Sequence, residues 1–398
     1  MASQPPYVPR AGLSPASASQ RRNQRHEFAV WWREIDRVLL FLVLSLMVIG
    51  AAAVAAASPA SARRLHVSDL HFFSLHLKWQ ALGLMVMFGA SALPKELTRR
   101  LAILLGFAMI IALALVPVVG SEVNGARRWL NLGVSLQPSE FLKPAFAIGL
   151  AWILSWKARD PAMPVIPIAT GVMGLVAALL MAQPDFGSTV LFAGVWFVLV
   201  LLSGIEVKRI AALGGAGVVA LVATYFLYDN ARHRIDSFLG GGTAYDQVDL
   251  GAKTIIAGGW TGSGLWLGTR KLALPEAHTD YIFSVIGEEF GLLVCMVIVA
   301  LYVAIVTRVL LRLTEEEDLF TVLAATGLIA QLGGQAFINI LVNLQLFPSK
   351  GMTLPLISYG GSSTVALCLG VGFLLALTRR NPYLKREKFS LKQAGAVQ

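Results

Sequence analysis

Long runs of apolar residues alternate with short polar connections along most of the chain. Ten of these runs approach or exceed the roughly 18 to 20 residues that an α-helix needs to cross the hydrocarbon core of a bilayer. They predict an all-α, polytopic integral membrane protein with about ten transmembrane helices. The predicted spans are residues 37–57, 77–94, 101–119, 139–156, 164–182, 188–205, 209–228, 283–311, 319–346 and 363–378.

Polar and basic residues dominate both ends of the chain. Residues 1–36 are rich in Pro, Ser and Arg and predict a disordered basic tail, and residues 379–398 predict a second basic tail suited to anionic lipid headgroups. Residues 37–378 form the predicted transmembrane domain. Its longest polar connection, at 229–282, lies between the seventh and eighth spans.

Composition agrees with a membrane location, since 56% of the residues are hydrophobic, 14% are charged and the mean hydropathy is +0.67. With a cytoplasmic N-terminus, the segments on the inner side hold 21 of the 33 Lys and Arg residues. This bias predicts that both termini are cytoplasmic. The net charge of +10 is spread over membrane edges, so it does not indicate nucleic acid binding.

With this topology, the informative polar motifs fall on the outer side, at 121–143, 183–189, 229–282 and 346–363. In a bacterium this side faces the periplasm, where ATP and nucleotide sugars are absent. A site there needs a substrate that arrives already activated, and a membrane protein is suited to receive one attached to a lipid.

Several polar residues also enter the predicted spans. Glu140 and Lys143 are three residues apart, so they share a helical face, either as a structural pair or as part of a site. The ninth span carries an amide stripe, which either bonds neighbouring helices or lines a polar interior. The stripe consists of Gln331, Gln335, Asn339 and Asn343.

A lipid-linked pyrophosphate needs cations and backbone N–H groups around its phosphates. Basic residues in the outer connections are candidates, among them Arg128 and Lys350. The turn SYGGSS at 358–363, with Ser358, Gly360, Gly361 and Ser362, precedes the last span, where a helix N-terminus favours anions. The same turn also suits a plain helix cap.

The segment LPEAHTDYIF places Glu276, His278 and Asp280 just before the eighth span. Asp280 is either an acid in the first helical turn or a catalytic base. One carboxylate with several cations suffices for a sugar donor with a pyrophosphate leaving group, because departure needs charge neutralisation more than a general acid. Glu276 and His278 are supporting residues, and His278 lacks a second ligand at metal-binding spacing.

Five stretches in order resemble the SEDS family of peptidoglycan glycosyltransferases over residues 35–385. They are VNGARRWLNLG, LQPSEFLK, QPDFGST, LPEAHTDYIFSVIGEEFG and NILVNLQLFPSKGMTLPLISYGGSS. Within the family, Lys350 in the last stretch and GEEFG in the fourth favour the cell-division members over those of elongation. The pattern departs at Tyr281, where Phe is usual, and fits only loosely at 229–250, so Arg232, Arg234 and Gln247 receive no role.

The resemblance implies polymerisation of lipid II, an undecaprenyl-pyrophosphate-linked disaccharide pentapeptide, on the outer face of the cytoplasmic membrane at the division site. It implies that Asp280 is the base. It also implies a class B penicillin-binding protein transpeptidase and other division proteins as partners. A divalent cation, Mg²⁺ or Mn²⁺, suits the leaving pyrophosphate, although no ligand cage is visible. The implied or chemically suggested substrate-binding residues are Arg128, Trp129, Glu140, Lys143, Asp185, Asn339, Lys350, Ser358, Gly360, Gly361 and Ser362.

Two other functions fit some of the same features. A transporter that flips lipid II would also use about ten spans and polar residues within them. The motifs collect on the outer side instead of at the membrane midplane, which favours the enzyme. A noncatalytic scaffold that recruits a transpeptidase would not require these polar motifs.

Overall fold

A computed structural model describes residues 29–123, 126–131, 133, 135–205, 207–227, 229–241, 244–348 and 351–380. Residues 37–378 form one unit, which is α-helical apart from three short strands, so the predicted fold class is confirmed. Most of both predicted tails, at 1–28 and 381–398, lies outside the described residues, and their disorder stays a prediction.

Each predicted apolar run coincides with a helix. Four of these helices, α2, α4, α11 and α12, are long and apolar enough to cross a membrane, and the total of ten spans stays a prediction. The predicted boundaries differ most at α2, which extends to Leu65, and at α3 and α4, which begin at His71 and Lys95. The helices are α2 Arg37–Leu65, α3 His71–Ser91, α4 Lys95–Val119, α5 Pro138–Ser155, α6 Val165–Met181, α7 Phe186–Leu202, α8 Val207–Leu227, α11 Ile282–Leu313, α12 Leu319–Asn343 and α13 Ser362–Leu377.

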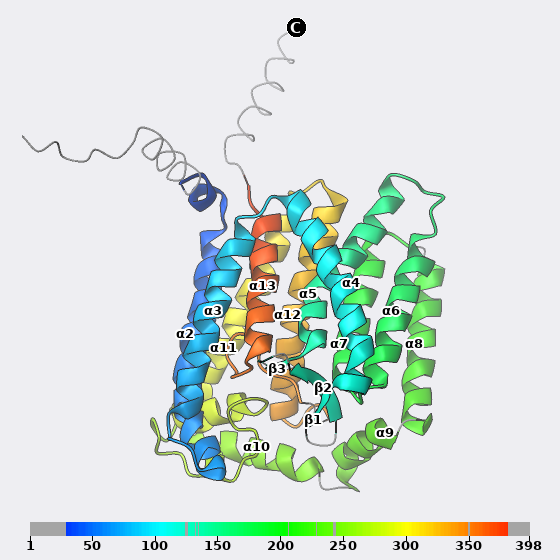
Figure 1. Ribbon diagram of the computed structural model, residues 1–398. Coiled ribbons are helices and arrows are strands. Elements are labelled where there is room, and N and C mark those ends of the chain that lie inside the picture. Colours follow the sequence, from blue (N-terminus) through cyan, green and yellow to red (C-terminus); the bar gives the residue numbers. More distant parts are fainter. Residues whose placement is uncertain are drawn as a thin grey trace, which may run out of the picture. The chain divides into compact units, whose positions relative to one another are not determined.

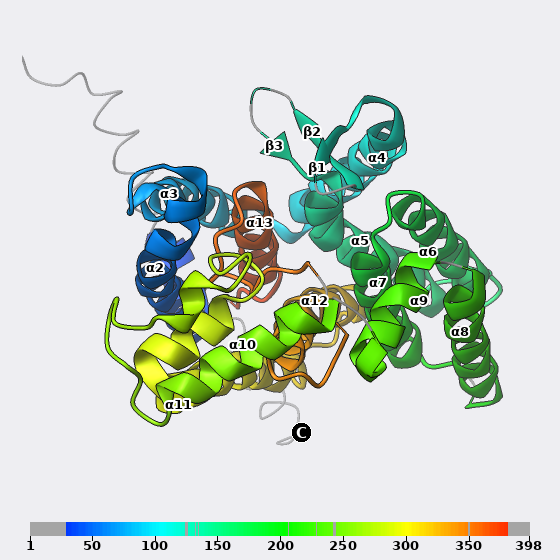
Figure 2. The same cartoon turned by 90° about the horizontal axis from the view of Figure 1, so that it is seen from below.

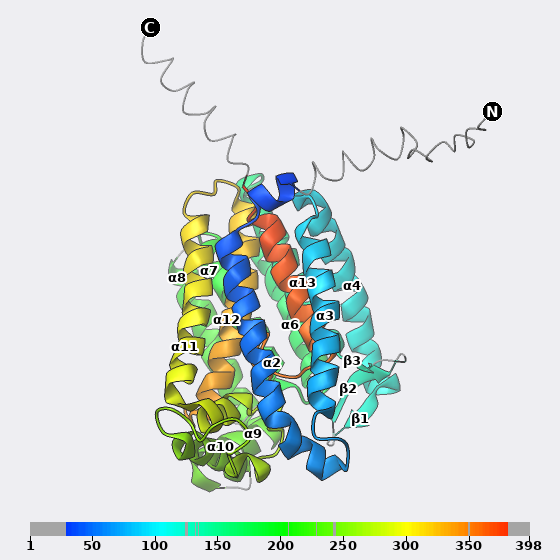
Figure 3. The same cartoon turned by 90° about the vertical axis from the view of Figure 1, so that its left-hand side faces the viewer.

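The long helices of this unit lie side by side in a bundle, as Figures 1 and 3 show from two directions. Helix α12 packs against α5, α7, α11 and α13, and α13 also packs against α3 and α5. Small residues permit the α5–α12 approach, since a Cβ added at Gly327 would lie 3.1 Å from the Cβ of Ala147. The polar faces of α5 and α12 are therefore brought together inside the bundle.

Four connections that the sequence places on the outer side gather at one end of the bundle, the lower end in Figure 1, which we call the loop end. There α10 lies across α11 and α12 (Figure 2). The sequence did not predict the strands or the short helices of these connections, because their segments are polar and short. They are antiparallel β1 Ser121–Val123, β2 Ala126–Asn131 and β3 Ser135–Leu136, the helices α9 Asp229–Asp236 and α10 Ala244–Gly258, and the short helices η2 Ser237–Gly241 and η3 Arg270–Leu272. A further short helix, η1 Trp156–Ala158, follows α5 in a connection that the sequence places on the inner side.

Helix α11 is broken near its loop end. Gly291 has φ 83° and ψ 173°, which interrupts the helical hydrogen-bond pattern. The segment 259–264 fills the break, because the carbonyls of Gly259 and Trp260 accept hydrogen bonds from Leu292 N at 3.0 Å and Leu293 N at 3.2 Å. Non-helical backbone inside a membrane protein needs such partners. The span predicted at 283–311 therefore coincides with α11 but contains a break that the apolar pattern did not indicate.

Candidate functional site

Asp280 lies in the segment between η3 and α11, and the backbone of this segment is held from two sides. The carbonyls of 278, 279 and 280 accept hydrogen bonds in succession from Tyr359 N at 3.0 Å, Ser358 Oγ at 2.6 Å and Asn339 Nδ2 at 2.9 Å. Three consecutive carbonyls bonded to distant parts of the chain leave the backbone little freedom. The backbone of Asp280, the predicted base, is therefore held in place.

The carboxylate of Asp280 is half-buried and lies beside the segment that leads into α13. A Cβ added at Gly351 would lie 3.3 Å from Asp280 Oδ2. Glycine at 351 therefore keeps the space next to the carboxylate open. Lys350, the neighbouring substrate-binding candidate, lies outside the described residues, and its role stays a prediction.

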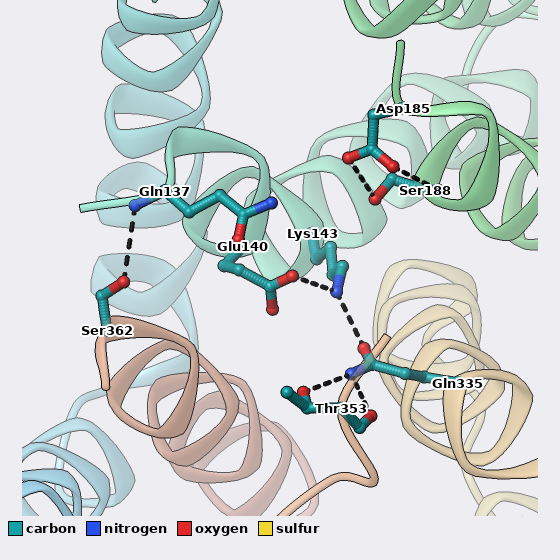
Figure 4. A network of polar contacts seen from close by, with 8 residues as sticks. All are labelled: Gln137, Glu140, Lys143, Asp185, Ser188, Gln335, Thr353 and Ser362. Carbon is teal, nitrogen blue, oxygen red and sulfur yellow. Dashed lines mark hydrogen bonds and ion pairs between the residues drawn. The ribbon is translucent and has the colours of Figure 1, made fainter. Parts of the chain in front are cut away.

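The predicted pair on α5 forms a buried ion pair. Lys143 Nζ lies 2.7 Å from Glu140 Oε1, with side chains that are 3% and 10% exposed respectively. Lys143 Nζ also donates to Gln335 Oε1 at 2.8 Å, and Gln335 Nε2 donates to the carbonyl of Thr353 at 3.0 Å (Figure 4). Burial of charge is tolerated because each charge has partners. The network joins α5, α12 and the segment before α13.

Asn339 connects this network to Asp280. Its Nδ2 donates both to the Asp280 carbonyl and to the carbonyl of Met352 at 2.6 Å, directly before Thr353. The amides of α12 therefore bond mainly to the loop-end segments, and Gln335 also bonds to α5. Of the two alternatives for the amide stripe, bonding between helices is therefore observed for Gln335 and Asn343.

Glu140 lines a small cavity and has one carboxylate oxygen without a hydrogen-bond partner among the described residues. This oxygen, Oε2, is buried. The cavity, of about 30 Å³, lies between α5, α12 and α13, and Gln331 and Lys143 add polar atoms to an otherwise apolar lining. A volume of this size accommodates a water molecule.

Two serines of the SYGGSS turn make hydrogen bonds within the protein. Ser358 Oγ accepts from Leu354 N at 2.8 Å while it donates to Thr279 O, and Ser362 Oγ accepts from Gln137 N at 3.4 Å. Gly361 adopts φ 50°, a value that favours glycine, and a Cβ at Gly360 would overlap the Ser363 hydroxyl. Anion binding by this turn stays a prediction.

Arg128 and Asp185 form a second cluster, in which the β2 strand meets the turn before α7. Arg128 Nε donates to Gln183 O at 3.2 Å, and its guanidinium also bonds to Pro184 O. Asp185 caps α7 by accepting from Ser188 N at 3.2 Å and Ser188 Oγ at 2.8 Å, apart from the Glu140–Lys143 network in Figure 4. Trp129 follows Arg128 in β2 and is partly buried. Their substrate contacts stay predictions.

Arg232, Arg234 and Gln247 lie in the helices α9 and α10 of the loop end. Arg232 and Gln247 are exposed, and the side chain of Arg234 lies outside the described residues. Within the described ranges, no three His, Cys, Asp or Glu side chains converge as metal ligands would. Sequence reasoning did not single out Ser284 or Thr353, because their partners are distant along the chain.

Comparisons with known proteins agree on one family. The family model described as a cell cycle protein, FtsW/RodA/SpoVE, matches residues 36–383. A relative in Caulobacter vibrioides, named as a probable peptidoglycan glycosyltransferase FtsW, is 36% identical over 373 residues, which cover 93% of this chain and 95% of the relative. A Hahella chejuensis protein of the same name is 38% identical over 332 residues, which cover 76% and 79% of the two chains.

Solved structures give the same result. A chain from a peptidoglycan synthase complex that coordinates polymerisation and crosslinking matches with a TM-score of 0.73 and 28% identity, over 86% of this chain and 97% of that one. The rod shape determining protein RodA of Thermus thermophilus matches with a TM-score of 0.66 and 28% identity, over 87% and 97%. The chain therefore belongs to the FtsW/RodA/SpoVE family of polytopic membrane proteins.

Proposed function

We propose that the chain is a peptidoglycan glycosyltransferase of cell division that polymerises lipid II into β-1,4 glycan strands. The observation that carries the proposal is the Asp280 segment, fixed by three successive carbonyls beside an open position at Gly351 and bonded through Asn339 to the network of Lys143. The names of the relatives support the same activity.

The chemistry follows from one base and nearby cations. Asp280 accepts the proton of the acceptor sugar's 4-hydroxyl as that oxygen attacks the anomeric carbon of the donor. A new C–O bond forms as the bond to the pyrophosphate breaks, and inversion converts an α-linked donor into a β-1,4 product. Lys143 contributes positive charge toward the departing pyrophosphate, and a Mg²⁺ or Mn²⁺ ion carried by the pyrophosphate is compatible with this scheme.

The setting of the reaction is part of the proposal. The loop end faces the periplasm, both termini are cytoplasmic, and the protein acts in the cytoplasmic membrane at the division site. A class B penicillin-binding protein crosslinks the new strand, in company with other division proteins. The similarity to a chain of a peptidoglycan synthase complex supports such a partner.

A polymerisation assay tests the proposal. The purified protein, with its transpeptidase partner, should convert labelled lipid II into polymer, and Asp280→Asn should lower the rate by about 10²-fold or more, since the amide cannot accept the proton. Asp160→Asn makes the same change in the turn between η1 and α6 and should keep the wild-type rate.

Other outcomes would favour the rival functions. Transfer of labelled lipid II across liposome membranes without polymer would indicate a transporter. Recruitment of the transpeptidase without polymer or transfer would indicate a scaffold. A normal rate in Asp280→Asn would remove this residue from the reaction.

A further inference from the structure

Residues 259–269, which we call the aromatic segment, lie at the loop end and carry no charge. Four of their large apolar side chains are between 46% and 70% exposed, namely Trp260, Leu265, Trp266 and Leu267. A cluster of exposed apolar side chains marks a surface that another molecule covers. The hydrogen bonds of this segment show at which depth of the membrane it lies.

Helix α11 gives the first measure of this depth. The carbonyl of Trp260 accepts from Leu293 N at 3.2 Å, and the side chain of Leu293 is exposed. From Leu293 to its last residue, Leu313, the helix is regular, and these 20 positions rise about 30 Å. The hydrocarbon core of a bilayer is also roughly 30 Å thick. With Leu313 at one boundary of the core, Trp260 therefore lies at the other.

Helix α2, which packs against α11, gives a second and independent measure (Figure 3). Pro59 lies inside α2 and has no N–H, so the carbonyl of Ala55 lacks its helical partner. Trp266 Nε1 donates to this carbonyl at 3.0 Å, a replacement that lets proline occur within a membrane helix. The 18 positions from Arg37, where α2 begins, to Ala55 rise about 27 Å. Both tryptophans therefore lie at the same boundary.

A buried carboxylate holds the aromatic segment in place. Glu289 of α11 accepts hydrogen bonds from Trp266 N and, at 3.3 Å, from Gly268 N, and it pairs with Lys271. The carbonyl of Glu289 also accepts from Gly264 N at 3.0 Å. These bonds keep the segment against α11, so it cannot fold over to bury its own apolar side chains.

Membrane lipid is the molecule that fits this surface. Exposed side chains of α11, such as Met296 and Val303, continue the apolar surface from Leu293 toward the middle of the helix. Tryptophan is enriched where the hydrocarbon core meets the headgroups, because its ring is apolar and its N–H is polar. The first charged residue after the segment, Arg270, is exposed, as a residue beside lipid phosphates would be.

We propose that the aromatic segment is a lipid anchor, in which Trp260, Leu265, Trp266 and Leu267 insert among membrane phospholipids at the loop-end boundary of the hydrocarbon core. The segment continues through η3 into the residues that carry Asp280, so the anchor sets the depth of this aspartate relative to the bilayer. The inference goes beyond the proposed function, since it holds whether or not the chain polymerises lipid II.

Fluorescence quenching at two depths tests the anchor. The full chain with Leu267→Cys is labelled with a thiol-reactive fluorophore, while Cys295 and Cys368 are buried. It is placed in phosphatidylcholine nanodiscs, whose two faces are both open to solutes, with a nitroxide either high on the lipid acyl chain or near its end. We expect the high nitroxide to quench the label at least about 2-fold more than the low one, and aqueous iodide to quench it weakly.

Two labelled controls set the scale. Val303→Cys lies halfway between Leu293 and Leu313 and should be quenched more by the low nitroxide. Asp160→Cys, an exposed position between η1 and α6, should be quenched by iodide alone. Absence of lipid quenching at position 267 would overturn the proposal. Iodide quenching there that is lost on addition of the transpeptidase partner would then identify a protein-docking surface instead.

Native tryptophan emission gives a second measurement in case Leu267→Cys does not fold. The emission of wild type minus that of Trp260→Phe is the contribution of Trp260. In nanodiscs of brominated lipid we expect this difference to fall to roughly half or less of its value in unbrominated lipid. An equal difference in both lipids would decide against the anchor.

Discussion

His278, two residues before Asp280, is half-buried against α2 and α3. Its Nδ1 lies 2.7 Å from Ser61 Oγ, and its ring centroid lies 4.2 Å from that of Phe72 and 5.4 Å from that of Tyr359. Desolvation by burial lowers the pKa of His278 to about 4, against the opposing charge of Glu276. The ring is therefore neutral at neutral pH and packs against aromatic neighbours, and the supporting role in the site predicted for it stays a prediction.

This depressed pKa predicts a pH-dependent stability. Between about pH 6.5 and 4 the unfolded chain binds a proton at His278 that the folded chain does not, so the free energy of unfolding falls as the pH falls, by about 1 to 3 kcal/mol. His278→Gln should flatten this slope in thermal unfolding midpoints measured across the range. His66→Asn, which changes an exposed histidine with φ 53°, should leave the slope unchanged.

At the scale of elements, the contacts around α11 show what local sequence patterns predict and what they miss. The apolar run 283–311 predicted this helix to within two residues at each end. Its break at Gly291 was hidden, because an isolated glycine within a helical pattern is often tolerated without a break. The hydrogen bond from Ser284 to Asn343 Oδ1 was hidden for another reason: the two residues are 59 positions apart along the chain. Only tertiary packing brings the two together.

The segment that fills the break depends on a second glycine. Gly262 has φ 83°, and a Cβ there would overlap the carbonyl of Glu289. Gly262→Ala should therefore lower the free energy of unfolding by at least about 2 kcal/mol. It should also speed proteolysis between α10 and α11. Gly171→Ala in α6 is the matched control, because its Cβ meets no atom within 4 Å; equal stability loss in both variants would contradict this account.

At the scale of the whole molecule, hydrophobic periodicity predicts the helices well and the loop end poorly. Each apolar run became a helix, because burial or lipid exposure of a long apolar stretch leaves few alternatives. The strand β2 and the helix α10 were not predicted, since their stability comes from neighbours such as α4 and α11. Of the candidate site, the Glu140–Lys143 pair followed from helical spacing, whereas its bond to Gln335 required the packing of α5 on α12.

Variants of the Glu140–Lys143 pair distinguish an effect on stability from an effect on activity. Lys143→Met leaves Glu140 buried without its cation, which should cost about 3 to 5 kcal/mol in the free energy of unfolding. Adding Glu140→Gln removes that charge and should restore most of the stability. We expect polymerisation to stay at least about 10-fold below wild type in the double variant, because the loss of Lys143 removes positive charge from the proposed pyrophosphate site.

The control for this pair is Glu96→Gln, which breaks exposed ion pairs of α4 and should change stability by no more than about 1 kcal/mol. Thermal unfolding and the lipid II assay, run on the same preparations, give both quantities. Recovery of activity together with stability in the double variant would show that the buried pair only supports the fold. Stability without activity would instead make α5 part of the site, with the donor held by α5, the base by the segment before α11, and α12 bonded to both.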